Sequence, residues 1–222
     1  GKQTDVFNGI DATITAGFSN GGSVQGGVST GKEVVDSCFV VDSPQQLLYL
    51  GAAPATAPAT PGTLGTTAAQ PGQGLYNCRV SPPWSAGTQV KSSIVYPLPW
   101  NLEVAANYQN LPPIDTRAAF TVTSAMAAPT LGRNFAGGGV RVGELIPLRS
   151  YFREPRNQQV DVRILRTFKV GTTRLQPEFD AYNLFNANSV LAQTQAYGAA
   201  FLRPTSVLGA RMIKFGVQVY FR

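Results

Sequence analysis

Apolar and polar residues alternate with a period of two along most of the chain, which predicts β-strands rather than helices. Residues 9–18 alternate in this way and end at the turn sequence 19–22. The clearest alternation closes the sequence, where one face of the expected strand carries Ile213, Phe215, Val217, Val219 and Phe221. We expect this face to meet lipid or another apolar surrounding, and the intervening residues to meet water or polar groups.

Similar patterns predict further strands at 23–32, 89–96, 101–108, 116–123, 140–148, 160–168 and 175–182. The connections near residues 20, 98 and 171 are short, whereas 38–86 and 184–207 are long and fall at the opposite end. Short turns on one side and long loops on the other are typical of bacterial outer-membrane barrels. The expected fold is therefore all-β, an antiparallel up-and-down meander of about nine strands that is part of an outer-membrane β-barrel. A soluble β-sandwich is the alternative, but it rarely combines this asymmetry with inner faces so rich in charge and amide.

Two local features refine this expectation. Pro177 lies inside an expected strand and should mark a bulge or a strand end, because proline cannot donate to the hydrogen-bond ladder. Tyr96, Trp100 and Tyr108 lie near the ends of the expected hairpin, where barrels carry girdles of aromatic residues.

Residues 1–222 are expected to form one barrel segment, interrupted by a long extracellular loop at 38–86. Much of this loop is built of Ala, Pro, Thr and Gly, which cannot bury enough apolar area to fold alone. Cys38 and Cys78 bracket it and predict one disulfide, formed in an oxidising compartment. Closing a loop of this size contributes about 3–4 kcal/mol in the chain-entropy model. Two unpaired buried thiols are the alternative interpretation.

Composition supports a membrane sheet rather than a membrane helix. Only 14% of the residues are charged, and no apolar run reaches the roughly 18 residues of a transmembrane helix. A mean hydropathy of −0.03 suits strands that alternate apolar and polar residues. The net charge of +6 is spread without a basic cluster, which argues against nucleic-acid binding. Basic residues at strand ends are expected either to face lipid phosphates or to be solvated.

The sequence offers little for catalysis, and we expect no enzymatic activity, cofactor or metal. The absence of histidine excludes His-based triads and imidazole metal sites. Residues 29–32 have the S-x-x-K spacing of serine acyl-enzymes, but they lie in an expected strand and lack the accompanying motifs. Glu178 and Asp180 share a strand face, where an acid and a base could work together. Barrel lumens routinely carry such residues, so we interpret the pair as part of a structural wall.

Three segments of the last third resemble a known family. Residues 157–163 (NQQVDVR), 179–188 (FDAYNLFNAN) and 210–221 (ARMIKFGVQVYF) resemble the last strands of TonB-dependent receptors, of the type with an N-terminal carboxypeptidase-regulatory-like domain. The resemblance is strongest over 157–222 and extends back to about residue 9, including the cysteine pair and the YPLPW sequence at 96–100. Arg222 departs from the terminal aromatic residue of the family.

The resemblance implies uptake of a scarce ligand in the outer membrane of a Gram-negative-type bacterium. The implied partners are outer-membrane lipid, the remaining strands and plug of a parent barrel, and, through that plug, the TonB complex. The plug has no match in these residues. No signal peptide is recognisable at Gly1, so either a leader has been removed or an N-terminal part of the parent is missing.

A second possibility follows from the strand count. Large transporters have about 22 strands, and an unclosed sheet leaves backbone groups unpaired at its edges. The missing strands of the parent would cover these edges. In the alternative, the chain is a structural subunit, a processed receptor fragment whose partners are further copies of itself in an extracellular fibre or tube.

Overall fold

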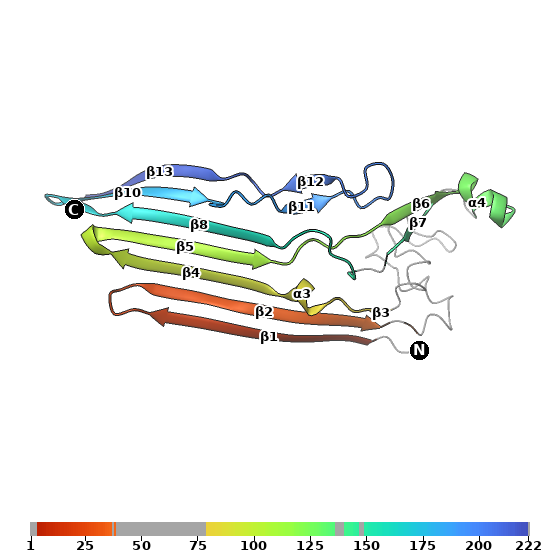
Figure 1. Ribbon diagram of the computed structural model, residues 1–222, viewed down its shortest axis with the longest axis horizontal. Helices are drawn as coiled ribbons and strands as arrows, with labels where there is room; N and C mark the ends of the chain where they lie inside the picture. Colours follow the sequence, from red (N-terminus) through yellow and green to blue (C-terminus); the bar gives the residue numbers. More distant parts are fainter. Residues whose placement is uncertain (1–3, 37, 39–78, 136–139, 147–148, 222) are drawn as a thin grey trace.

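The main element of the protein is a single antiparallel sheet of nine strands (Figure 1). The computed structural model describes residues 4–36, 38, 79–135, 140–146 and 149–221. Seven strands form the path across the sheet, in the order β1 (Thr4–Gly17), β2 (Ser23–Asp36), β4 (Gln89–Leu98), β5 (Leu102–Leu111), β8 (Asn157–Arg166), β10 (Thr173–Tyr182) and β13 (Met212–Tyr220). Two short strands complete it: β3 (Arg79–Val80) pairs with β2, and β9 (Phe168–Val170) pairs with β10.

This architecture confirms the expected all-β antiparallel meander of about nine strands. The sheet is open: within the described part of the chain, no strand pairs with the outer edges of β1 and β13. Closure into a barrel therefore stays a prediction.

Smaller elements lie in the connections. The expected strands at 116–123 and 140–148 are not part of the main sheet. They form a separate ladder of β6 (Ala119–Thr123) and β7 (Val140–Glu144), because β5 and β8, which flank this connection, already pair with each other. A second small ladder joins β11 (Val190–Gln193) to β12 (Pro204–Val207). The helical turns that lie wholly within the described residues are α3 (Trp84–Gly87), η3 (Pro99–Asn101) and α4 (Ser124–Leu131), none of which the alternation pattern predicted.

The two ends of the sheet differ in their connections (Figure 1). The turns at 18–22, 99–101 and 171–172 lie together at what we call the short-turn end, as expected. The first turn is closed by hydrogen bonds from Phe18 N to Gly22 O at 2.7 Å and from Gly21 N to Phe18 O at 3.0 Å. The long connections lie at the opposite, long-loop end, where β6, β7 and α4 are found. Of the expected loop 38–86, residues 39–78 lie outside the described residues.

Pro177 does not create the bulge or strand end that the sequence predicts. Strand β10 runs through it, and its register with β13 continues from Arg174 to Tyr182. The pairing is interrupted on the opposite edge of β10. There β10 pairs first with β9 and then with β8, in the same register, with a gap between the two ladders at Pro177. Proline has no N–H to donate to this neighbour, so a gap in one ladder is sufficient to accommodate it.

The register brings the apolar residues of all seven strands onto one side of the sheet, the apolar face. One row of directly paired residues crosses the whole sheet: Ala16, Val24, Ile94, Ala106, Val162, Ala181 and Ile213. Because side chains alternate along a strand, the intervening residues form the opposite, polar face. Within the described strands of the sheet, charged residues occur on the apolar face only near its ends, at Lys32 and Asp36 on β2, at Arg79 on β3 and at Arg166 on β8.

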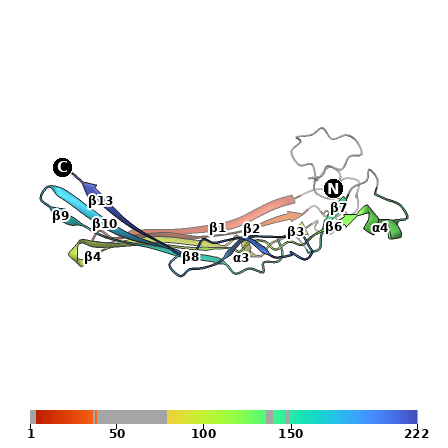
Figure 2. The same cartoon turned by 90° about the horizontal axis from the view of Figure 1, so that it is seen from above.

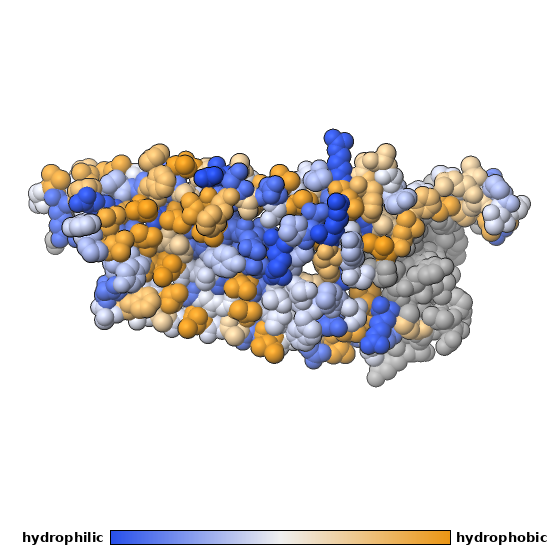
Figure 3. Space-filling view, viewed as in Figure 1, coloured by the Kyte–Doolittle hydropathy of each residue, from blue (hydrophilic) through white to orange (hydrophobic). Residues whose placement is uncertain are grey.

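No second layer formed by the described residues covers the long strands, which form one curved sheet when seen edge-on (Figure 2). Hydrophobic residues consequently lie open on the surface along the sheet (Figure 3). Ile10 is 66% exposed and Phe215 is 78% exposed. Among the described residues, the buried apolar side chains are those of Pro82, Ala118 and Ala181. The sheet therefore exposes apolar surface that a globular protein would bury.

None of the helices within the described residues is long and apolar enough to cross a lipid bilayer.

Candidate functional site

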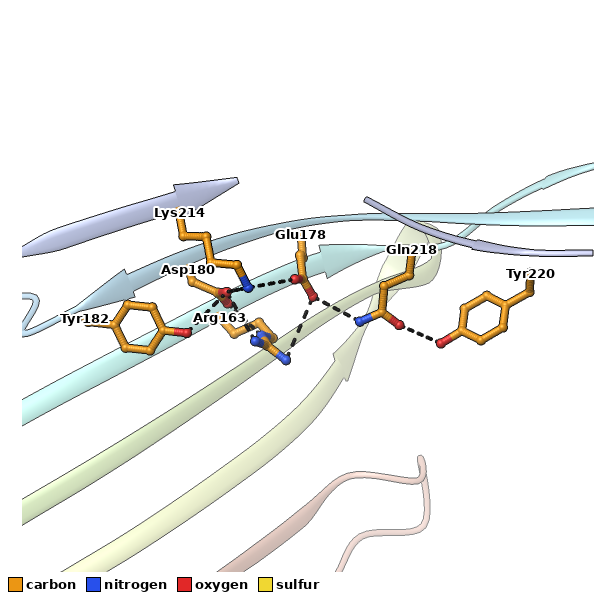
Figure 4. Close-up of polar contacts among 7 residues, drawn as sticks. All are labelled: Arg163, Glu178, Asp180, Tyr182, Lys214, Gln218 and Tyr220. Atoms are coloured by element: carbon orange, nitrogen blue, oxygen red, sulfur yellow. Dashed lines mark hydrogen bonds and ion pairs between the residues drawn. The ribbon is translucent and has the colours of Figure 1, made fainter. Parts of the chain in front are cut away.

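The polar face carries its strongest interactions on three neighbouring strands, where four charged residues meet (Figure 4). The register places Arg163 of β8, Asp180 of β10 and Lys214 of β13 directly beside one another. Arg163 donates from Nε to Asp180 Oδ1 at 2.6 Å and from Nη2 to Oδ2 at 3.1 Å. Lys214 Nζ lies 3.4 Å from Glu178 Oε1 and 3.5 Å from Asp180 Oδ2. Arg163 Nη1 is 3.8 Å from Glu178 Oε2, so each cation faces both carboxylates.

The two carboxylates lie beneath the two cations. The side chains of Asp180 and Glu178 are 3% and 8% exposed, whereas those of Arg163 and Lys214 are 41% and 52% exposed. A buried carboxylate is costly unless it is paired and hydrogen-bonded, and here both conditions are met. The two positive and two negative charges cancel. This arrangement suits a rigid wall, because neither carboxylate is left free to act on a substrate.

Gly216 provides the space in which Glu178 lies. The two residues are direct partners across β10 and β13. A Cβ atom at position 216 would come within 2.6 Å of Glu178 Oε1 and 3.0 Å of its Cγ. Glycine therefore allows the carboxylate to lie across β13 and reach Lys214.

Neutral side chains extend the network along the strands (Figure 4). Gln218 Nε2 donates to Glu178 Oε2 at 3.4 Å, and the Tyr220 hydroxyl donates to Gln218 Oε1 at 2.6 Å. On the other side, the Tyr182 hydroxyl donates to Asp180 Oδ2 at 3.4 Å. The network thus covers much of the polar face of β10 and β13.

A shallow groove of about 500 Å³ lies on the polar face between β1 and β8. It is lined chiefly by hydroxyl and amide side chains, with Lys91 and Asp161 as its charged members. Asp161 Oδ1 accepts hydrogen bonds from Gln159 Nε2 at 2.9 Å and from the Asn183 N–H at 2.8 Å. Such a lining can bind polar ligand groups or a polar polypeptide segment through hydrogen bonds.

The described residues include no group of three or more His, Cys, Asp or Glu side chains placed to hold a metal ion.

Aromatic residues mark the short-turn end. Phe18 and Tyr96 pack edge to face, with ring centroids 5.9 Å apart. Trp100 is 77% exposed in the β4–β5 turn and adopts a left-handed backbone conformation with φ 64°. Tyr108 lies nearer the opposite end of β5, where its hydroxyl accepts a hydrogen bond from Asn110 Nδ2 at 3.0 Å.

The residues predicted to face lipid lie together on the apolar face of the last strand. Ile213, Phe215, Val217 and Val219 belong to β13 and are all exposed, and Phe221 directly follows the strand. Contact with lipid stays a prediction. Cys78 lies outside the described residues, so the disulfide with Cys38 also stays a prediction.

The sequence alone did not identify the four-charge cluster. It placed Arg163 and the two carboxylates among polar strand positions, but pairing residues 17 positions apart requires the register, which no motif encodes.

Comparison of the chain with protein-family models, curated proteins and solved structures gave no match.

Proposed function

We propose that this chain is the C-terminal part of the wall of an outer-membrane β-barrel of the TonB-dependent receptor type, which takes up a scarce ligand. The apolar face would contact lipid and the polar face would line the lumen. The observation that carries this proposal is the exposed apolar face, which continues across seven strands and opposes a face with neutralised buried charges. In a soluble protein, the apolar face of a sheet is buried and its polar face is exposed to water.

The lengths of five of the seven strands on the path support the proposal, and β1 and β2 are longer, with 14 residues each. Strands β4, β5, β8 and β10 have 10 residues each and β13 has 9, close to the 9–11 residues with which a tilted strand crosses a bilayer. The apolar face carries charge only near its ends, and a cation at mid-membrane would cost about 2–4 kcal/mol.

The direction of the edge strands favours completion by other strands of a parent barrel. Seven strands alternate in direction along the path, so β1 and β13 run the same way. Two copies in the same membrane orientation could join these edges only as a parallel pair. An antiparallel barrel has an even number of strands, so the part that completes this sheet would contribute an odd number.

The long-loop end would face outward and contribute to ligand capture. The segment 184–207 contains β11 and β12 and places aromatic rings there. Tyr197 packs against Phe201 at 5.5 Å and against Phe120 of β6 at 6.1 Å between ring centroids. Tyr197 is exposed, whereas Phe120 and Phe201 are half-buried, and an exposed ring on a loop held by a rigid sheet is suited to binding.

The unpaired edges of β1 and β13 support the alternative, a structural subunit that polymerises outside the cell. Two inverted copies could pair their β13 edges in antiparallel fashion and so extend the sheet. Fractionation separates the alternatives. Recovery from outer membranes with a longer polypeptide that carries a plug supports the receptor, whereas homogeneous fibres of the 23.6 kDa chain support the subunit.

A matched pair of substitutions on β13 tests the lipid-facing assignment. Phe215→Arg places a cation on the apolar face, whereas Gln218→Arg places it on the polar face beside Glu178. Partitioning of the full chain into phospholipid vesicles should weaken by about 2–4 kcal/mol for Phe215→Arg and change little for Gln218→Arg. Equal partitioning of the two variants, or failure of the unsubstituted chain to enter vesicles, would refute the proposal.

A further inference from the structure

The apolar face carries one cation at the short-turn end, without a neighbouring carboxylate among the described residues. Arg166 is the last residue of β8 and is exposed. Its partner on β5 is Leu102. On the other side, the common register of β8 and β9 with β10 places Pro177 opposite Arg166. Both neighbours are apolar, and no carboxylate of the described strands lies on this face at this end. The Arg166 side chain makes no hydrogen bond or ion pair within the described residues.

The guanidinium group of Arg166 is held in place by an aromatic ring. It lies over Phe168, 4.8 Å from the ring centroid, and both side chains belong to the apolar face. A guanidinium stacked on a ring keeps its N–H donors directed outward in the plane of the group. Arg166 is therefore oriented as a donor, although the described residues offer it no anion.

The level of Arg166 in the bilayer indicates which anion it could bind. If the apolar face contacts lipid, as proposed above, the short-turn end lies at the level of the lipid headgroups in one leaflet. Aromatic residues such as Phe18 and Tyr96 surround this level, as in the interfacial girdles of barrels. The anion available there is the headgroup phosphate, whose oxygens match the paired N–H donors of arginine.

We propose that Arg166, held by Phe168, binds the phosphate of an anionic phospholipid headgroup, whose charge no choline cation balances, in the leaflet at the short-turn end. The inference rests on the proposed membrane function and adds a lipid-binding site to it. The site would fix the depth of the sheet at this end, because the phosphate binds only when Arg166 reaches the headgroup level.

The experiment compares binding of the full chain to vesicles of phosphatidylcholine alone and of phosphatidylcholine mixed with phosphatidylglycerol. Arg166→Gln removes the proposed donor. The matched control is Lys169→Gln, which removes the same charge at the same end but from the polar face of β9. The measured quantity is the ratio of the two partition coefficients, which reports preference for the anionic headgroup. Arg166→Lys retains the charge without the paired donors.

Arg166→Gln should lower this ratio about fivefold, the equivalent of roughly 1 kcal/mol for a basic residue at an anionic surface. Lys169→Gln should leave the ratio nearly unchanged, and Arg166→Lys should fall between them. Equal effects of the two glutamine substitutions would overturn the site, because net charge alone would then explain the preference. Replacing chloride with inorganic phosphate at constant ionic strength should preserve the preference; its loss would show a site for free phosphate instead.

These outcomes are separable from failure of the proposed function. If the unsubstituted chain enters neither kind of vesicle, the membrane assignment itself is wrong. If it enters both kinds and Arg166→Gln behaves like the unsubstituted chain, only the phosphate site is refuted.

Discussion

Arg163 and Asp180 are direct partners across β8 and β10 and are joined by two parallel hydrogen bonds, at 2.6 Å and 3.1 Å. The pair lies next to Val162 and Ala181, which belong to the apolar row that crosses the sheet. A slip of one residue would break both hydrogen bonds and also turn the apolar residues to the polar side. The pair therefore favours the register on which the separation of the two faces depends.

Asp180→Asn tests this contribution to stability. The substitution leaves Arg163 and Lys214 with Glu178 as their remaining carboxylate, and should lower the free energy of unfolding by about 1–3 kcal/mol. The estimate is modest because both cations reach solvent. Denaturant unfolding followed by circular dichroism measures the change. The control is Asp11→Asn on exposed β1, which should change stability by less than about 0.5 kcal/mol. Similar stabilities of the two variants would show that the ion pair contributes little.

Asn183→Ala should loosen the connection between β10 and β13. The Asn183 side chain donates to Ala187 O and Gly209 O and accepts from Ala187 N, each at 2.8 Å. Its backbone also adopts a left-handed conformation, with φ 51°, which asparagine tolerates better than alanine. Loss of these bonds should destabilise the segment locally by about 1–3 kcal/mol. Limited proteolysis should therefore cut residues 184–211 faster in this variant.

The control for this prediction is the exposed neighbour Asn188, which makes none of these bonds. Asn188→Ala should be cut at the rate of the unsubstituted chain. Equal cleavage rates for both variants would mean that Asn183 does not hold the connection.

The two tryptophans should report the two ends of the sheet. Trp84 lies in α3 towards the long-loop end, and Trp100 lies in the short turn between β4 and β5 (Figure 1). Trp84→Phe and Trp100→Phe each leave one fluorophore. In vesicles that contain brominated lipids, we expect the fluorescence of both tryptophans to be quenched more strongly by bromine near the headgroups than by bromine deep in the acyl chains. The reason is that interfacial tryptophans lie at headgroup level. Strongest quenching of Trp100 by deep bromine would place the short-turn end inside the membrane core.

The sequence predicted the strands well where alternation was regular and less well where one side chain broke it. Strand β1 begins at Thr4, five residues before the expected start. Phe7 obscured this extension because it is an apolar residue on the polar face. Its ring covers Gly9 and Gly31, where an added Cβ atom would clash with the ring. Phe7 therefore fills the space that two paired glycines leave, which single-strand periodicity cannot reveal.

Tertiary pairing accounts for the other differences. The sequence predicted strands at 116–123 and 140–148, but not that residues 119–123 and 140–144 would pair with each other outside the main sheet. It marked Pro177 as an irregularity, yet whether proline ends a strand or interrupts one ladder depends on its neighbours. For the candidate site, the sequence placed Glu178 and Asp180 on one face. Their neutralisation by Arg163 and Lys214 required three strands in register.

A spin-label scan along β13 tests the central claim most directly. Single cysteines at positions 212–220, in a background with Cys38 and Cys78 replaced by serine, would carry a nitroxide in vesicle-bound protein. We predict a period of two, with strong relaxation by oxygen, which concentrates in lipid, at Ile213, Phe215, Val217 and Val219. Strong relaxation by a water-soluble nickel complex is expected at the intervening positions. Weak oxygen relaxation at the four apolar positions, or no alternation along the strand, would contradict the account.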